Sequence, residues 1–415
     1  MRLRSILKAL GPGFVAGASD DDPAGIGTYI QSGAQFGYSQ LWIALFSTPF
    51  MIVVQEMSGR IGMVTGQGLA AVIRNNYARP VLLFVIGIQV LTNTINIGAD
   101  LSAMAESARL LWHIPYYALL ALTTALTSAL IVLVPYRAYS TYLKFLGLTL
   151  FAYVVAAFTV HVDWRQAAIA AVVPHIRWDK GFILTLIAVF GVTISPYEFF
   201  WQSSEEVEEI VGEHKLVREE SARPRTSKAD VRFLDKDTTF GMVFSNAITL
   251  FVIITAAATL HARGYANVQS AAQAAEVLKP LAGPLTSLIF AAGIVSSGLL
   301  AIPVMAGSSA YAVGGAFEWP RSLGKPFWQE WRFYGVIVGS CAIGLFVNVL
   351  HVSPFRLLYY SAVLNGMISP VLLFIVTQIA SNRKIMKSFT NSRKSTAMGW
   401  TLCAFMTLAL IAYLV

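Results

Sequence analysis

The stretch of sequence that decides the fold is residues 17–29, GASDDDPAGIGTY, where three consecutive acidic residues precede a proline. Pro23 cannot donate a backbone hydrogen bond, and its ring clashes with the preceding helical turn. The residue before it, Asp22, is disfavoured in helical geometry, and Gly25 and Gly27 weaken a helix further. The sequence therefore predicts that a helix is broken here, beside a carboxylate.

The rest of the chain has the composition of an integral membrane protein. Of its 415 residues, 56% are apolar and 13% are charged, whereas soluble domains carry roughly 25% charged residues. Long apolar runs recur along the chain without the alternation of barrel strands. At about 20 apolar residues per spanning helix, they predict an all-α membrane protein with about 11 transmembrane helices. This composition excludes an ordinary water-soluble enzyme.

The basic residues predict the orientation in the membrane. With a cytoplasmic N-terminus, 23 of the 30 Lys and Arg residues fall on the cytoplasmic side, as the positive-inside rule requires. Topology then accounts for the net charge of +8, and no nucleic-acid partner is expected. We expect a multi-pass protein of a bacterial plasma (inner) membrane whose C-terminus is extracytoplasmic. The sequence does not determine the oligomeric state.

A helix break at membrane depth has a chemical consequence. Its free carbonyls survive only where they are buried in protein or line a water-filled cavity, and carboxylates at that depth mark functional sites. Carbonyls beside the Asp22 carboxylate therefore predict a cation site. A second break is predicted in residues 190–202, FGVTISPYEFFWQ, at Pro196 and close to Glu198. Paired broken helices in corresponding positions of two halves are typical of inverted-repeat transporters.

The breaks and apolar runs divide the chain into expected regions. A first five-helix repeat is expected at residues 1–162 and a second at residues 181–380, separated by an extracellular loop at 163–180. The second repeat includes a cytoplasmic connector at 203–237. Residues 381–415 are expected to form a cytoplasmic loop and an eleventh helix.

Residues 11–42, GPGFVAGASDDDPAGIGTYIQSGAQFGYSQLW, resemble the first-helix region of the NRAMP family of divalent-metal transporters. That family has a DPGN motif followed by a similar run ending in GAQFGY; here the motif reads Asp22-Pro23-Ala24-Gly25. Its sixth-helix motif, A-T-V-M-P-H-N, corresponds to VTISPYE at residues 192–198. The resemblance implies a LeuT-like 5+5 inverted repeat with broken helices 1 and 6 and one extra C-terminal helix. It also implies inward movement of metal ions, often with protons.

Departures from the family pattern change the expected metal. Gly25 stands where the family has a metal-binding Asn, and Ser195 where it has a metal-binding Met, while Val192 replaces an Ala that binds through its carbonyl. Loss of the thioether removes a preference for softer metals, and loss of the Asn side chain opens space. We therefore expect a divalent cation harder than Fe²⁺, with Mn²⁺ and Mg²⁺ both open. The expected metal-site residues are Asp22, Ser19, Gly25, Val192, Thr193 and Ser195.

Proton coupling stays open at this point. Asp100 in the third span resembles the family's third-helix acid used in proton transfer, and the alternative is a structural buried pair with Arg332 or another basic group. Tyr197 replaces a His that the family links to proton movement, and Glu198 replaces an Asn. Glu198 could carry a proton instead, or transport could be uncoupled from protons.

Three further residues are secondary candidates. Asp20 and Asp21 either attract cations to the inner mouth or face cytoplasmic water. Asn365 in the tenth span is either a ligand in an occluded state or a partner in a helix–helix hydrogen bond.

Two other functions compete with this one. A LeuT-like transporter of a small organic solute would use the break for a substrate carboxylate, which three adjacent acids oppose. An intramembrane aspartyl protease would need Asp22 and Asp100 to share a proton, and it leaves the paired breaks unexplained. The expected function is import of a divalent cation by alternating access. The metal is then the substrate, no cofactor is required, and the bilayer and potentially protons are the other partners.

Overall fold

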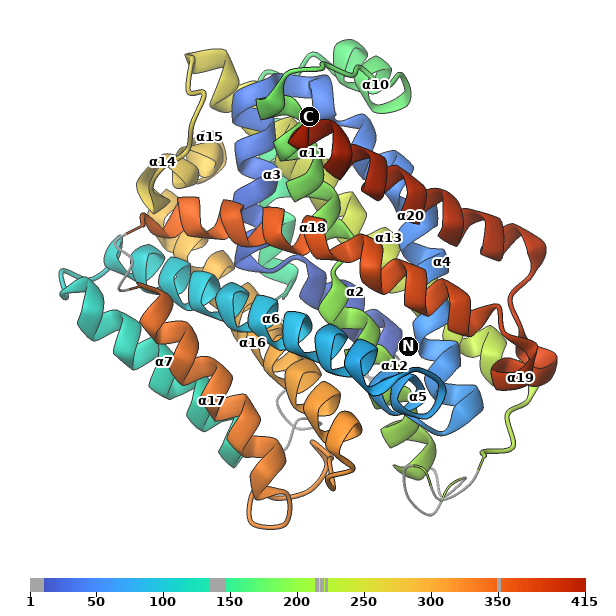
Figure 1. Ribbon diagram of the computed structural model, residues 1–415. Coiled ribbons are helices and arrows are strands. Elements are labelled where there is room, and N and C mark those ends of the chain that lie inside the picture. The colour runs from blue at the N-terminus through green and yellow to red at the C-terminus, as the bar shows by residue number, and fades with distance from the viewer. Residues whose placement is uncertain (1–10, 135–146, 213–215, 217–219, 221–222, 349–351) are drawn as a thin grey trace, which may run out of the picture.

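Helices build this structure, and no strand occurs among the residues that it describes. The computed structural model describes residues 11–134, 147–212, 216, 220, 223–348 and 352–415. Figure 1 shows a helical bundle with α2 (Pro12–Asp20) and α3 (Pro23–Phe36) near its centre and α20 (Arg393–Leu414) at its periphery. The predicted all-α class is confirmed.

The first predicted break separates α2 from α3. Helix α2 ends at Asp20, and α3 begins at Pro23 with Asp22 as its N-cap. The Asp22 carboxylate accepts a hydrogen bond from Gly25 N at 2.5 Å, which satisfies one of the free N–H groups of the first turn. Proline suits the first helical position because its missing N–H would have no partner there.

The second predicted break separates α11 (Lys180–Thr193) from α12 (Pro196–Gly212). Ile194 leaves helical geometry, with φ −122° and ψ 70°, and the Ser195 carbonyl accepts a hydrogen bond from Glu198 N at 3.1 Å. The two breaks thus share one design, in which a proline starts the second half-helix and a polar residue precedes it.

The other elements follow in chain order around these two broken helices. Between the breaks lie η1 (Gly37–Gln40), α4 (Trp42–Thr65), α5 (Leu69–Asn76), α6 (Arg79–Arg109), α7 (Tyr116–Leu133), η2 (Gly147–Leu150), α9 (Phe151–Thr159) and α10 (Trp164–Val172). After α12 come α13 (Lys228–Thr259), η3 (His261–Arg263), α14 (Ala271–Ala275), η4 (Glu276–Leu278), α15 (Lys279–Ala282), η5 (Gly283–Leu285), α16 (Thr286–Phe317), α17 (Trp331–Val347), α18 (Pro354–Ala380), α19 (Arg383–Met386) and η7 (Lys387–Phe389).

Seven helices in the described ranges are long and apolar enough to cross a membrane. They are Arg79–Arg109, Tyr116–Leu133, Lys180–Gly212, Lys228–Arg263, Ala271–Phe317, Pro354–Ala380 and Arg393–Leu414. The segments Pro23–Gln40 and Trp42–Thr65 pass the same test together, bent by 104°, and Trp331–Val347 is shorter. A multi-pass membrane protein is confirmed, while the number of about 11 spans stays a prediction.

The predicted connector at 203–237 is largely helical where it is described. Its first part, 203–212, continues α12, and its last part, 228–237, begins α13. Residues 213–215, 217–219 and 221–222 of the connector lie outside the described residues. The predicted extracellular loop at 163–180 likewise contains a helix, α10.

Glycines let the broken helices pack backbone to backbone on their neighbours. A Cβ added at Gly17 in α2 would overlap the backbone of Gly241 in α13, and one added at Gly191 in α11 would overlap Gly366 in α18. Small residues at such crossings are typical of membrane helices, whose association depends on close packing. Helix α2 is therefore held directly against α13.

Candidate cation site at the two helix breaks

Asp22 occupies the position that the sequence predicts, at the start of α3. Its side chain is only 2% exposed, and one of its oxygens caps the helix through Gly25 N. The N-terminus of a helix carries a partial positive charge that favours a carboxylate. The cap therefore holds Asp22 in a fixed orientation beside the freed backbone.

Asp20 ties the first break to two other helices. Its Oδ1 accepts a hydrogen bond from Ser195 Oγ at 2.9 Å, and its Oδ2 accepts one from Ser245 Oγ in α13 at 3.1 Å. Ser195 Oγ also lies 2.9 Å from the carbonyl oxygen of Val192. The carboxylate of Asp20, the hydroxyl of Ser195 and the carbonyl of Val192 therefore form one oxygen cluster between the breaks.

A second link joins the breaks through Tyr197. Its hydroxyl donates to the Ser19 carbonyl at 3.2 Å, and Ser308 Oγ donates to the Tyr197 carbonyl at 2.7 Å. Thr193 Oγ1 lies 3.4 Å from Tyr29 Oη. The Ser19 carbonyl, a predicted ligand, therefore already has a hydroxyl partner, which a bound cation would have to displace.

Asp100 from the third span reaches the same break. Its Oδ1 accepts a hydrogen bond from Ala24 N in the first turn of α3 at 3.1 Å. The side chain is fully buried, and no described residue donates a hydrogen bond to its Oδ2. Asp100 therefore lies beside the Asp22–Gly25 cap and presents a free oxygen there.

Several buried carboxylate oxygens around the breaks lack a hydrogen-bond donor among the described residues. They are both oxygens of Asp21, Oδ2 of Asp100 and Oε1 of Glu198. None of the described Lys or Arg side chains forms an ion pair with these three acids. Unpaired buried carboxylates are unfavourable in the apolar interior, so the site has the charge that a bound cation would neutralise.

The ligand set cannot consist of side-chain carboxylates alone. No group of three or more His, Cys, Asp or Glu side chains within the described part of the chain is arranged to hold a metal ion. Carbonyls, hydroxyls and water would have to supply the remaining oxygens, as Mg²⁺ and Mn²⁺ accept.

The structure corrects the expectation that Gly25 opens space. A Cβ added at Gly25 would lie 3.1 Å from the Asp20 carbonyl oxygen and 3.2 Å from Asp22 Oδ1. Both distances are shorter than ordinary van der Waals contact, because the break folds back over the first turn of α3. The missing side chain thus allows two oxygen-bearing groups to approach each other.

Two other expectations about candidate residues are also settled by position. Arg332 is exposed and lies over the rings of Trp319 and Trp331, which contradicts the ion pair with Arg332 given as an alternative for Asp100. Asp20 and Asp21 are each 1% exposed, so neither faces cytoplasmic water.

Asn365 is buried in α18, and no described residue pairs with its Nδ2. The amide nitrogen of Asn365 therefore does not donate the expected helix–helix hydrogen bond to any described residue in this conformation. Its role as a ligand in an occluded state stays a prediction.

The two halves of the broken first span are fastened at opposite ends. In α3, Gln31 Oε1 accepts a hydrogen bond from Val268 N at 2.8 Å. At the start of α2, Asp237 of α13 accepts hydrogen bonds from Gly11 N at 2.9 Å and Phe14 N at 3.0 Å. These contacts fasten each half of the broken span to the rest of the bundle.

Sequence reasoning missed several of these partners. Ser245 lies in an apolar run, where a single serine carries no signal of its own, and Asp237 lies in a charged segment that resembles a connector. Gln31 belongs to the stretch that resembles the NRAMP family, but its partner at Val268 is more than 200 residues away. The packing of α13 against α2, and of the segment after η3 against α3, brings these residues together.

Comparison with known proteins finds similarity over nearly the whole chain. The Nramp family model, described as natural resistance-associated macrophage protein-like, matches residues 13–415. The divalent metal cation transporter MntH of Klebsiella pneumoniae subsp. pneumoniae is 27% identical over 407 residues, which cover 96% of this chain and 91% of that protein.

Solved structures of transporters share the fold. The Eremococcus coleocola manganese transporter aligns with a TM-score of 0.77 at 19% identity, covering 97% of this chain and 85% of that chain. Mhp1, a nucleobase-cation-symport-1 family transporter, aligns with a TM-score of 0.60 at 15% identity, covering 98% of this chain and 90% of that chain. These likenesses confirm the predicted LeuT-like fold.

Proposed function

The chain belongs to the Nramp family and is a divalent metal cation transporter, and we propose that it imports a hard cation, Mn²⁺ or Mg²⁺, through the site at its two helix breaks. Membership in a transporter family excludes the intramembrane protease. The metal is cargo and not a resident cofactor. The observation that carries the proposal is the gathering of Asp20, Asp22 and Asp100 with the hydroxyl of Ser195 at the breaks.

Asp22 is the proposed anchoring ligand of the cation. The carbonyls of Ser19 and Val192 lie within hydrogen-bond reach of Tyr197 and Ser195, so a small movement of these hydroxyls would release both carbonyls to the ion. Thr193 and Ser195 would add hydroxyl oxygens, and water would complete the shell. All of these ligands are oxygen atoms, which suit hard cations.

The choice of cation follows from what the site lacks. Ser195 supplies a hydroxyl where a thioether would favour softer metals. The name of the Eremococcus coleocola relative supports manganese, and the oxygen-only shell supports Mg²⁺ equally. Strong preference for Cd²⁺ or Fe²⁺ over Mn²⁺ and Mg²⁺ in a competition assay would contradict a hard site.

The direction and energetics of transport are proposed from the same residues. We place the protein in the plasma membrane with its N-terminus in the cytoplasm, following the distribution of basic residues. Asp100 and Glu198, whose free oxygens flank the breaks, are the proposed route for a proton or second ion. A pH indicator inside proteoliposomes, read during Mn²⁺ influx, decides whether protons move with the metal.

Flux measurements with a single substitution test the site. Purified protein is reconstituted into liposomes, and Mn²⁺ influx is compared between wild type and Asp22→Ala. We expect the variant to show only background flux, because the anchoring carboxylate is gone. Asp163→Ala is the matched control, since Asp163 is an exposed acid that caps α10 far from the breaks. Undiminished flux in Asp22→Ala would refute the site.

A further inference from the structure

Helix α12 sorts its acidic residues onto two faces. Glu205 and Glu208 accept hydrogen bonds from the hydroxyl of Tyr311 in α16, at 2.9 and 2.5 Å. Glu206 and Glu209 face the other side, where they line a pocket. The acid-rich end of α12 is therefore a folded part of the bundle with two different surfaces.

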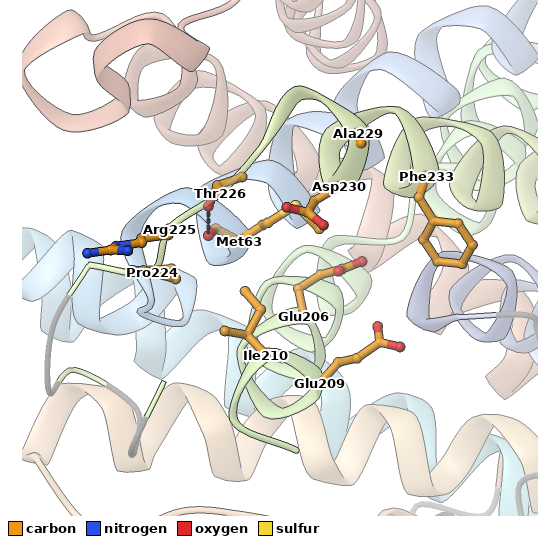
Figure 2. A pocket seen from close by; sticks show the side chains of 10 residues that line it. All are labelled: Met63, Glu206, Glu209, Ile210, Pro224, Arg225, Thr226, Ala229, Asp230 and Phe233. Atoms are coloured by element: carbon orange, nitrogen blue, oxygen red, sulfur yellow. Dashed lines mark hydrogen bonds between the residues drawn. The ribbon is translucent and has the colours of Figure 1, made fainter. Parts of the chain in front are cut away.

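The pocket lies between α12, the end of α4 and the start of α13, and has a volume of about 300 Å³. Figure 2 shows the carboxylates of Glu206, Glu209 and Asp230 around it, with the Arg225 side chain directed away from them. It lies at the end of the bundle where α2 begins, because Asp237, two turns beyond Asp230 in α13, caps α2. The pocket therefore concentrates negative charge at one end of the transporter.

Glu206 is the residue that points to a ligand. Its side chain is buried, with 3% of the residue exposed. Its one hydrogen-bond contact with a described residue joins Oε1 to Gln202 Nε2 at 3.5 Å, the outer limit for such a bond. No ion pair with a described Lys or Arg involves it. A buried carboxylate in this setting requires a positive partner, and its place in the pocket wall makes it available to a cation.

A polar stripe connects this pocket to the second helix break. Glu198, Gln202, Glu206 and Glu209 recur at spacings of four, four and three residues, which places them along one face of α12. Glu198 Oε1 and Gln202 Oε1 are buried without a donor among the described residues. The stripe thus offers a series of oxygen atoms from the break to the pocket.

The size and spacing of the pocket favour a hydrated ion over a chelated one. The described acids do not bring three ligating side chains around one point, so they would not strip an ion of its water. An ion with six waters occupies roughly 180 Å³ at about 30 Å³ per water, which fits the pocket. Mg²⁺ in particular keeps several waters when it binds to one or two carboxylates.

We propose that this pocket is a release site, in which a hydrated divalent cation that has left the helix breaks is held by Glu206 and Glu209 before it leaves the protein. The direction of movement rests on the proposed import function. Binding in the pocket does not, because it depends only on the acids that line it. The two claims can therefore be tested separately.

Quenching of a local fluorophore by Mn²⁺ tests the pocket in the full-length protein. Ala229, an exposed residue of the pocket wall, is replaced by cysteine and labelled, after the buried Cys341 and Cys403 are changed to alanine. Asp22→Ala in the same chain removes the proposed central site. We expect Mn²⁺ to quench the fluorophore in this background, and Mg²⁺ to reverse the quenching by competition.

Variants that replace one glutamate by glutamine then identify which acids bind Mn²⁺ in the pocket. Glu206→Gln should raise the Mn²⁺ concentration for half-maximal quenching roughly tenfold, the factor that corresponds to about 1.4 kcal/mol. Glu209→Gln, at a partly exposed position, should raise this concentration as well. Glu208→Gln is the matched control, because Glu208 does not line the pocket and accepts its hydrogen bond from Tyr311 on the side of α12 that faces α16. Equal quenching in all three variants would overturn the proposal.

Two further outcomes distinguish the proposed release site from the proposed transport site at the helix breaks. Quenching that depends on Glu206, combined with no Mn²⁺ flux through the protein with Asp22 intact, would support the pocket and refute the transport site. If Mn²⁺ flux depends on Asp22 but quenching is unchanged by Glu206→Gln and Glu209→Gln, only the release site would be refuted. Without metal, Glu206→Gln should raise the unfolding temperature, because it removes an unpaired buried charge.

Discussion

Ser195 Oγ lies 2.9 Å from Asp20 Oδ1, although the two residues are 175 positions apart in the chain. This hydrogen bond connects the helix break of the first span to that of the sixth. Ser195 stands where the family motif has a methionine, and Asp20 lies outside the family's DPGN motif. The bond places this hydroxyl next to this acid. We therefore expect the selectivity of the site to depend on both breaks together.

Replacing Ser195 should change which metals compete. We expect Ser195→Met to make Cd²⁺ a stronger inhibitor of Mn²⁺ influx, because a thioether sulfur favours softer metals. Ser195→Ala is the matched control, since it loses the hydroxyl without adding sulfur. Inhibition curves for Cd²⁺ and Mg²⁺ in proteoliposomes give the comparison. If Ser195→Met and Ser195→Ala respond alike to Cd²⁺, the sixth-span position does not select the metal.

Gly25 should not accept a side chain without loss. Gly25→Ala would press a Cβ against the Asp20 carbonyl and the Asp22 carboxylate, and such overpacking typically lowers stability by about 1–3 kcal/mol. We expect lower Mn²⁺ flux and a lower unfolding temperature. Gly87→Ala is the control, because Gly87 lies in α6 with no atom near its added Cβ. A Gly25→Ala protein with unchanged flux and unfolding temperature would show that the break relaxes easily.

Asp237 should control the seating of α2. Asp237→Asn weakens the acceptor for Gly11 N and Phe14 N, and loss of a helix cap typically lowers stability by about 0.5–2 kcal/mol. We expect a cysteine placed at Val15, which is buried in α2, to react faster with a maleimide in this variant. Asp163→Asn, which alters the cap of α10, is the control. Equal labelling rates in both variants would mean that Asp237 does not hold α2.

Glu220 should contribute a stability that disappears in acid. Burial by itself would raise the pKa of Glu220, but hydrogen bonds from Arg321 at 2.5 Å and Arg74 at 2.6 Å outweigh it and lower the pKa below its ordinary value. A carboxyl with a lowered pKa in the folded state stabilises the protein above its unfolded pKa, and this contribution is lost as the pH falls through the folded pKa.

Unfolding temperatures at several pH values measure this contribution. The difference between wild type and Glu220→Gln should be largest near pH 7 and should shrink below about pH 4, the ordinary range of a glutamate. Glu318→Gln is the control, because Glu318 also lies near Arg74, at 3.5 Å, but is 74% exposed. A wild-type advantage that is independent of pH would contradict an ionic role for Glu220.

Much of the candidate site could be predicted from local sequence. Pro23 and Pro196 end helical geometry through their own covalent structure, so both breaks were predictable without any tertiary contact. Asp22 follows from the first break, because a carboxylate directly before a helix start is a natural N-cap. The spacing of Gly25 and Ser195 relative to these prolines also follows from the motif.

Other parts were not predictable because they depend on distant packing. Asp20 was expected near an aqueous mouth. Its carboxylate instead accepts hydrogen bonds from Ser195 at the second break and from Ser245 in α13. Arg332 was a plausible partner for Asp100 by charge alone, but the start of α17 places it on two tryptophan rings. The acidic sequence of α12 indicated a connector. In the structure, one face of this helix contacts α16 and another lines a pocket.

The sequence by itself determined the membrane-spanning helical class, the two breaks and the acid at the first of them. These properties arise from composition, hydropathy and the backbone chemistry of proline, which act locally. Only the tertiary structure decided which oxygens meet at the breaks. Hydrogen bonds such as those from Ser195 to Asp20 and from Ala24 to Asp100 form between helices far apart in the chain, and their geometry depends on how those helices pack against one another.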